Sequence, residues 1–306
     1  EKSIGYSSSP LTKYPAGGLK ELLSLSVPLT LIFLSTSLLI FCDRYFLSRF
    51  SLESWKACSA VTPLCSFFQI IFMVIGGIAQ SFVGRFKGQG QNRLIGPYIW
   101  QTIWFSFFTI ALTYPASQIT TFYIKGSEIE AQGTQYFQLL MLGNFLYPLG
   151  SGLSSFFSGL GKVKTLLLSI VMTHILNVSL DIFLIYGIKG LFPPLGITGA
   201  AIATLLSQFT FCLVLFLVFI KKNNSKTYCS HLWKINWMYM WNVLKKGIPF
   251  SIGRGMGITC WLFASFIMIN KGADHLLALS FVTTLYLAFA FIHEGLTQTL
   301  VTIISH

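Results

Sequence analysis

The sequence predicts an all-α, polytopic membrane protein, and three observations support that class. Of the 306 residues, 54% are hydrophobic and only 10% are charged, and the mean hydropathy is +0.69. This composition is too apolar for a water-soluble domain of that length. The apolar residues gather into eight runs, each long enough to cross about 30 Å of hydrocarbon as a helix of roughly 20 residues. The basic residues lie between the runs and form no continuous basic face, which argues against nucleic acid as a partner despite the net charge of +12.

The predicted spans follow one another along the whole chain. In order they cover residues 22–46, 57–84, 94–118, 134–158, 165–188, 196–220, 247–270 and 276–304. Gly and Pro inside these runs are tolerated in a membrane bundle, where neighbouring helices satisfy the freed backbone groups. Residues 1–21 are polar and lack the apolar core of a cleaved signal peptide, so we expect the first run to be the membrane signal.

The placement of the basic residues predicts the orientation. The N-terminal segment and the segments after the second, fourth and sixth runs carry 14 of the 21 Lys and Arg residues. By the positive-inside rule, this predicts a multi-pass protein of the inner (cytoplasmic) membrane with its N-terminus in the cytoplasm. The six cysteines lie mostly inside apolar runs without a CxxC pattern, which predicts neither a disulfide framework nor a zinc site.

Asp181 is the residue that points most directly to function. It lies inside the apolar run 165–188, with no lysine or arginine within seven residues. A carboxylate in hydrocarbon is costly, so it normally faces a bundle interior or a wet cavity and marks an ion or proton path. Asn177 lies one helical turn earlier on the same face, where its amide can contact the carboxylate or share a bound cation. The alternative is a structural acid that fixes helix packing; its depth and its Asn177 neighbour favour the ion path.

Two further oxygen ligands fall at a similar depth. If the helix 165–188 runs outward, Asp181 lies about 10 Å from its outer end. Asp43, near the outer end of the first run, and Thr204, in the sixth, belong to the same half of the bilayer. From the residues alone, Asp43 next to Arg44 is also compatible with an interfacial salt bridge. Thr204 alone is compatible with a hydroxyl that bonds its own backbone.

An internal repeat predicts the architecture. The motif SVPL at 26–29 recurs as GIPF at 247–250, and GGIAQSF at 76–82 recurs as EGLTQTL at 294–300. Six predicted helices separate the copies, and an even number preserves orientation. We therefore expect parallel repeats related by an axis along the membrane normal, with a substrate site between them.

The repeat also predicts four segments. They are a cytoplasmic N-terminal segment at 1–21, an N-lobe of six transmembrane helices at 22–220, a basic cytoplasmic linker at 221–246 and the first two helices of a C-lobe at 247–306. The second repeat is therefore expected to be incomplete.

Several motifs in a fixed order and spacing carry a family resemblance. They are SVPL, then FCDRYFLSRFS at 41–51, GGIAQSFVGRFKGQG at 76–90, NVSLDIFLIYG at 177–187, GITGAAIAT at 196–204 and GIPFSIG at 247–253. With these motifs the chain resembles, over essentially its whole length, the multidrug and toxic compound extrusion (MATE) family of cation-coupled antiporters.

The resemblance implies a twelve-helix fold of two six-helix lobes that exports cationic or amphipathic small molecules in exchange for H⁺ or Na⁺, with no other cofactor. It assigns the coupling site to Asp43, Asn177, Asp181 and Thr204, which could also hold Na⁺. Gly257 stands where some members carry an acid in the seventh helix, so a C-lobe site of that type is not expected. Helices 9 to 12 have no counterpart here, and a separate polypeptide is one candidate to supply them.

Three other residues are candidates for relay or gating. Arg254 and Glu294 lie in the last two runs, and we predict an ion pair between them; the alternative is an arginine that reaches the headgroups alone. His174 shares the Asn177 face and is a candidate proton relay, although a lone helix histidine more often serves packing.

Other function classes remain open to different degrees. A lipid-linked oligosaccharide flippase has the same two-lobe plan but should show a more basic cavity. An inactive, truncated membrane protein is a further alternative. An enzyme is not predicted, because the remaining histidines are scattered and form no cluster with acids or serines.

Overall fold

Long helices account for most of the chain in the computed structural model, which describes residues 13–305 apart from 16–17, 119–121, 123 and 128. Five of the described helices are long and apolar enough to cross a membrane: Leu19–Phe50, Leu52–Gly88, Val163–Tyr186, Gly196–Phe219 and Trp237–Met268. The only β pairing among the described residues is an isolated bridge between Ile188 and Phe192. The predicted all-α membrane fold is therefore confirmed.

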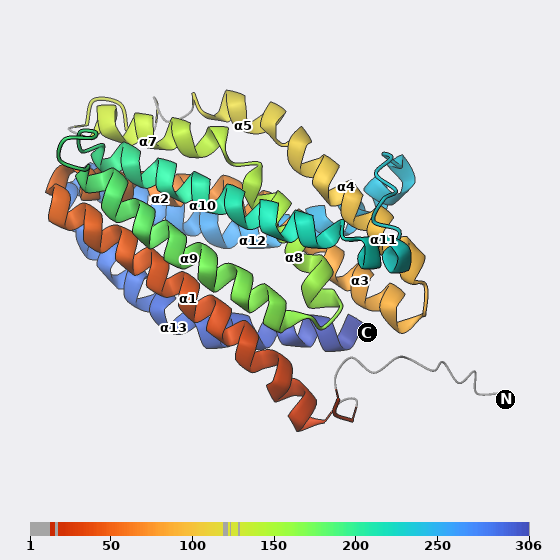
Figure 1. Cartoon of the computed structure of the whole chain (residues 1–306). Coiled ribbons are helices and arrows are strands. Elements are labelled where there is room, and N and C mark those ends of the chain that lie inside the picture. Colours follow the sequence, from red (N-terminus) through yellow and green to blue (C-terminus); the bar gives the residue numbers. More distant parts are fainter. Residues whose placement is uncertain (1–12, 16–17, 119–121, 123, 128, 306) are drawn as a thin grey trace.

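The helices form one bundle, in which the longest members lie side by side (Figure 1). Their bounds are α1 (Leu19–Phe50), α2 (Leu52–Gly77), α3 (Ala79–Gly88), η1 (Asn92–Leu94), α4 (Ile95–Phe108), α5 (Ile110–Ala116), α7 (Glu130–Leu142), α8 (Leu146–Gly159), α9 (Val163–Tyr186), α10 (Gly196–Phe219), α11 (Lys222–Tyr228), α12 (Trp237–Lys271) and α13 (Ala273–Ser305).

Three of the predicted spans are interrupted in the structure. Run 57–84 breaks at Ile78 between α2 and α3, run 94–118 at Thr109 between α4 and α5, and run 134–158 between α7 and α8. The first break directly follows two glycines, which are poor helix formers. At Thr109 the side-chain hydroxyl donates to the Ser106 carbonyl at 2.6 Å. The hydropathy pattern does not reveal such breaks, because the residues on both sides remain apolar.

The segment predicted as a linker, 221–246, contains helical structure. It holds all of α11, and α12 already begins at Trp237. Side chains of α4 fix the stretch between these two helices: Trp100 donates to the Ser230 carbonyl at 2.7 Å, and Gln101 to the Lys234 carbonyl at 3.2 Å. The connection between the repeats is therefore bound to the body of the first repeat.

The two repeats pack against each other in a swapped arrangement. Helix α12 is the repeat equivalent of α1 but packs on α2, where a Cβ added at Gly247 would lie 3.1 Å from Ile75. Helix α13 is the equivalent of α2 and α3 but packs on α1, where the backbone of Thr30 faces Gly295. Figure 1 shows α13 alongside α1. This exchange of partners is what a two-fold axis between parallel repeats produces.

Equivalent residues meet where the repeats touch. Gln80 and Gln298 are separated by 218 residues, which is the offset between the GGIAQSF and EGLTQTL motifs, and the Gln80 amide donates to the Gln298 carbonyl at 3.2 Å. The same amide donates to the Thr302 hydroxyl at 2.6 Å. A residue that contacts its own repeat equivalent lies at the symmetry axis, so this buried pair marks the axis between the repeats.

We predict that Gln80→Leu weakens the contact between the repeats. The substitution preserves the size of a buried side chain but removes two inter-repeat hydrogen bonds, each with a net contribution of about 1 kcal/mol. The thermal midpoint in detergent, followed by fluorescence-detected gel filtration, should fall by several degrees. Gln91→Leu, in an exposed turn, is the matched control and should leave it unchanged. Equal midpoints for both variants would show that these bonds do not hold the repeats together.

Candidate ion-binding site

Helices α1 and α9 run parallel with a nearly constant offset in sequence. The Ser35 hydroxyl and His174 Nδ1 lie 2.6 Å apart, an offset of 139 residues. Higher along the pair, the Tyr186 hydroxyl donates to the Phe46 carbonyl at 2.9 Å, an offset of 140. Asp43 and Asp181 differ by 138 positions and lie between these two contacts. Their carboxyl groups are close enough to interact electrostatically.

Three of the four carboxylate oxygens of the acid pair are buried and accept no hydrogen bond from the described residues. Asp181 is 0% exposed, and neither of its carboxylate oxygens has a hydrogen-bond partner among the described residues. The same holds for Asp43 Oδ1 and for the side-chain oxygen of Asn177, which is 2% exposed. Asp43 is half-buried and Asp181 is fully buried, so the pair is closed to solvent on the Asp181 side. Buried acceptor oxygens on Asp43, Asp181 and Asn177 without a partner among the described residues have the chemistry of a cation or proton site.

A tight turn sets the position of α10 beside this pair. Helix α9 ends at Tyr186 because Gly187 adopts φ +73°, and the Leu195 N–H returns to the Leu184 carbonyl at 3.1 Å. Gly199 packs against the same carbonyl, so α10 descends antiparallel to α9. Five residues further on, Thr204 reaches the level of Asn177 and Asp181.

The hydroxyl of Thr204 donates to the Ala200 carbonyl at 2.9 Å. This is the backbone bond that the sequence alone offered as the alternative. It leaves the lone pairs of the oxygen free, so the bond does not prevent Thr204 from acting as an acceptor ligand. The structure gives no direct contact between Thr204 and the acid pair.

Two side chains near the pair were missed in the sequence. The phenol of Tyr136, on α7, is hydrogen-bonded to the thiol of Cys58, on α2, and both lie within electrostatic range of Asp43. Each stands six residues from the outer end of its helix, a depth close to that of Asp43. That matching depth is the signal that could have revealed them. They extend the polar layer from two further helices.

His174 has a defined structural partner. Its contact with Ser35 ties α9 to α1 seven residues below Asp181. This is the role of a hydrogen-bonded spacer between helices, and a relay role remains a prediction.

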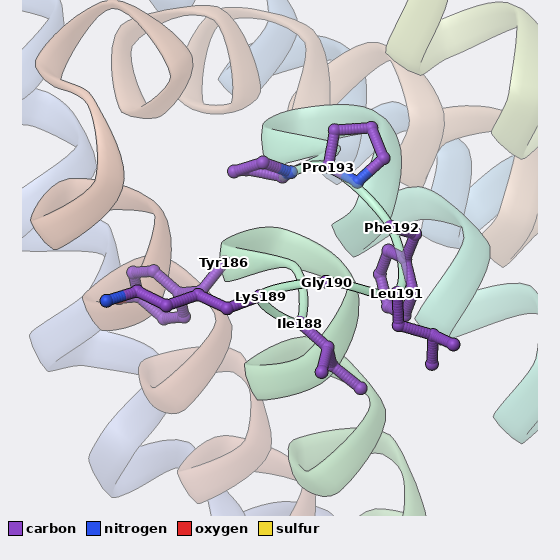
Figure 2. Close-up of a pocket in the computed structure, with 8 residues that line it drawn as sticks. Tyr186, Ile188, Lys189, Gly190, Leu191, Phe192 and Pro193 are labelled. Carbon is purple, nitrogen blue, oxygen red and sulfur yellow. The ribbon is translucent and has the colours of Figure 1, made fainter.

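The turn between α9 and α10 encloses a hollow of about 520 Å³ at the outer end of the site. It is lined by Tyr186 and by residues 188–194, and includes none of the four predicted ligands. Figure 2 shows Tyr186 and Lys189 extending to the same side of the turn. Its wall is therefore formed by the turn itself, one and a half helical turns beyond Asp181.

Arg254 and Glu294 form a bidentate ion pair between α12 and α13. The guanidinium nitrogens Nη1 and Nη2 lie 3.2 and 3.4 Å from Oε1 and Oε2 of the carboxylate. The side chains are 51% and 27% exposed. By the repeat offsets, their equivalents are Phe33 and Gly76, so the first repeat has no such pair. A role in gating remains a proposal.

The helices and the parallel repeats define a multi-pass helical membrane protein. Residues 28–183, just over half of the chain, match the family described as MatE. The chain belongs to this family.

Curated relatives carry names of the same kind. A probable multidrug resistance protein NorM of Thermotoga maritima is 28% identical over 266 residues, which cover 83% of this chain and 56% of that protein. A probable multidrug resistance protein NorM of Bacillus subtilis is 23% identical, with coverage of 88% and 62%. The chain thus spans little more than half the length of the curated relatives it matches.

Solved structures share the fold. An outward-facing multidrug resistance MATE family transporter of the MOP superfamily superposes with a TM-score of 0.78 at 19% identity, covering 93% of this chain and 63% of the other. A MOP superfamily transporter from Pyrococcus furiosus gives a TM-score of 0.77 at 18% identity, with the same coverage of both.

We predict that Asp181→Asn stabilises the ion-free protein. Above the pH at which the acid pair ionises, the substitution removes an unpartnered buried charge, and we expect the free energy of unfolding in Na⁺-free detergent to rise by on the order of 1–2 kcal/mol. A site ligand binds only the folded form, so added Na⁺ or acid should raise the thermal midpoint of the wild type but not of the variant. Ser169→Ala, at a half-buried position of α9 three helical turns from Asp181, is the control. A variant that responds like the wild type would exclude Asp181 as the ligand.

We also predict that the charges at Arg254 and Glu294 are exchangeable. Either single reversal, Arg254→Glu or Glu294→Arg, places two like charges 3.2–3.4 Å apart inside the bilayer and should reduce the yield of folded protein severalfold. The double reversal should restore it. A double variant as poor as the single ones would argue that each residue acts through other neighbours.

Proposed function

We propose that this chain forms the ion-coupling part of a multidrug efflux antiporter. The observation that carries the proposal is the fully buried Asp181 next to Asp43, with acceptor oxygens that no donor satisfies. A packing acid would be expected to accept hydrogen bonds from its neighbours, whereas an ion ligand needs its oxygens free. The names of the curated relatives support multidrug efflux as the process.

In the proposed mechanism, binding and release of H⁺ or Na⁺ at the two acids shift the protein between two conformations. With both acids ionised, Asp43 and Asp181 repel each other in a medium that cannot screen them. A cation that enters past the half-buried Asp43 removes this repulsion and favours one conformation; its release favours the other. H⁺ needs only the bridge between the two carboxyls. Na⁺ needs several oxygens, and Asn177 and Thr204 would supply two more.

The proposed substrates are cationic or amphipathic small molecules, bound between the repeats. Because the chain spans about half of its curated relatives, we propose transport for a protein that contains this segment together with the remaining helices, in one chain or in two. We further propose the inner membrane as its location, with the N-terminus in the cytoplasm, on the basis of the 14 basic residues on that side.

We predict that Asp181→Asn abolishes ion-driven efflux in that protein. Export of a cationic dye from proteoliposomes should follow an imposed H⁺ or Na⁺ gradient in the wild type and fall to the protein-free background in Asp181→Asn and Asp43→Asn, since the neutral amide cannot be charged and discharged. The gradient that drives export identifies the coupling ion. Glu53→Gln, an exposed acid at the start of α2, is the matched control and should transport normally. Full coupled export by Asp181→Asn would refute the proposal.

A further inference from the structure

The fourth apolar run is bent at its centre. Helix α7 ends at Leu142 and α8 begins at Leu146, so the interruption falls in the middle of the run 134–158. The bend keeps its backbone satisfied: the Leu146 N–H donates to the Gly143 carbonyl at 3.0 Å, and the Tyr147 N–H to the Asn144 carbonyl at 3.1 Å. The side chain of Leu205, on α10, occupies the space where a Cβ of Gly143 would stand. Asn144 is therefore held at the bend by close packing.

The side chain of Asn144 lacks every partner that its chemistry requires. The residue is 0% exposed, and neither its amide nitrogen nor its amide oxygen has a hydrogen-bond partner among the described residues. Burying an amide without hydrogen bonds is strongly unfavourable. Two donor hydrogens and one acceptor oxygen of Asn144 thus have no protein partner among the described residues.

Neutral polar groups from three helices surround the bend. Gln208 and Cys212, on α10, donate to the Leu146 carbonyl, each at 3.2 Å. The phenol of Tyr147 is hydrogen-bonded to Gln69, on α2, and lies within electrostatic range of Asp43. The bend is therefore the next polar layer inward from the acid pair.

We propose that Asn144 binds a water molecule at this bend. A metal cation would satisfy the amide oxygen but leave the two N–H donors unpaired and facing a positive charge. Water accepts from the nitrogen and donates to the oxygen, so it alone completes both. The inference also deepens the proposed function, on which this second part rests: Gly143 of the bend packs against Leu205, the residue after Thr204, so the water would extend the route for protons from the proposed ligands toward the middle of the bundle.

Water-edited solid-state NMR of the chain in bilayers, with ¹⁵N-labelled asparagine, tests the site. The side-chain amide signal that disappears in Asn144→Leu should receive magnetisation from water in the wild type. Asn242, whose amide donates to the Tyr98 hydroxyl at 3.1 Å, provides a reference signal with a protein partner. A folded wild type whose Asn144 signal receives no transfer from water overturns the proposal.

Thermal stability gives a second test, because the thermal midpoint of Asn144→Leu should change in opposite directions with and without a bound water. If the amide were unpartnered in the bilayer, Asn144→Leu would replace an unsatisfied group by an apolar one of similar volume and raise the thermal midpoint. If the amide holds water, the leucine removes a hydrogen-bond partner of that water, and the thermal midpoint stays unchanged or falls. A raised midpoint therefore overturns the site.

The route is tested separately in the complete transporter. Asn144→Leu should slow H⁺-driven dye export by about tenfold, equivalent to 1.4 kcal/mol of barrier, while the water signal of Asn144 persists in Asp181→Asn. Unchanged export in Asn144→Leu would remove the route and leave the antiporter proposal intact. Loss of coupling only on replacement of Asn144, and not of Asp181, would remove the antiporter proposal and leave the water site intact.

Discussion

The parallel alignment of α1 and α9 is the constraint on which the site depends. Two hydrogen bonds fix the offset of the helices at 139 and 140 residues, and this places two acids from distant parts of the chain side by side. Alone in hydrocarbon, either acid would be only a cost. Paired, with Asn177 one turn below Asp181, they form the site at which we propose that a positive charge is stabilised more strongly than in water. The register of two helices thus creates an electrostatic property that neither helix has.

The sequence contained enough to predict the helices but not their interruptions. Hydropathy marks where a chain enters and leaves the membrane, so the long spans α1, α9 and α10 were found within a few residues. The breaks at Ile78 and Thr109 involve local features that a hydropathy pattern does not record, and the break at Gly143 is packed against Leu205 across the bundle. The early start of α12 was also missed: its first turns read WMYMW, and the residues just before them are held by Gln101 of α4.

Site residues that lie close together in the sequence could be predicted from it, whereas residues that meet only in the folded chain could not. Asp181 and Asn177 are one helical turn apart, so their shared face follows from spacing alone. Asp43 could be joined to them only through depth and the family resemblance, because its neighbour Arg44 offers an equally simple local explanation. Tyr136 and Cys58 offered only a matching depth in the sequence, and for Asn144 three-dimensional packing alone shows that its amide has no partner among the described residues.

The helices that meet at the axis between the repeats are equivalent, but the side chains that meet there are not. Gln80 reaches across to Thr302, but the reciprocal bond from Gln298 would have to end on Gly84, which has no side chain. Had the two halves arisen as identical copies, the ancestral dimer would have carried the same residue on both sides of this junction. The junction is therefore one-sided, because the printed side-chain bonds across it come from Gln80 of the first repeat.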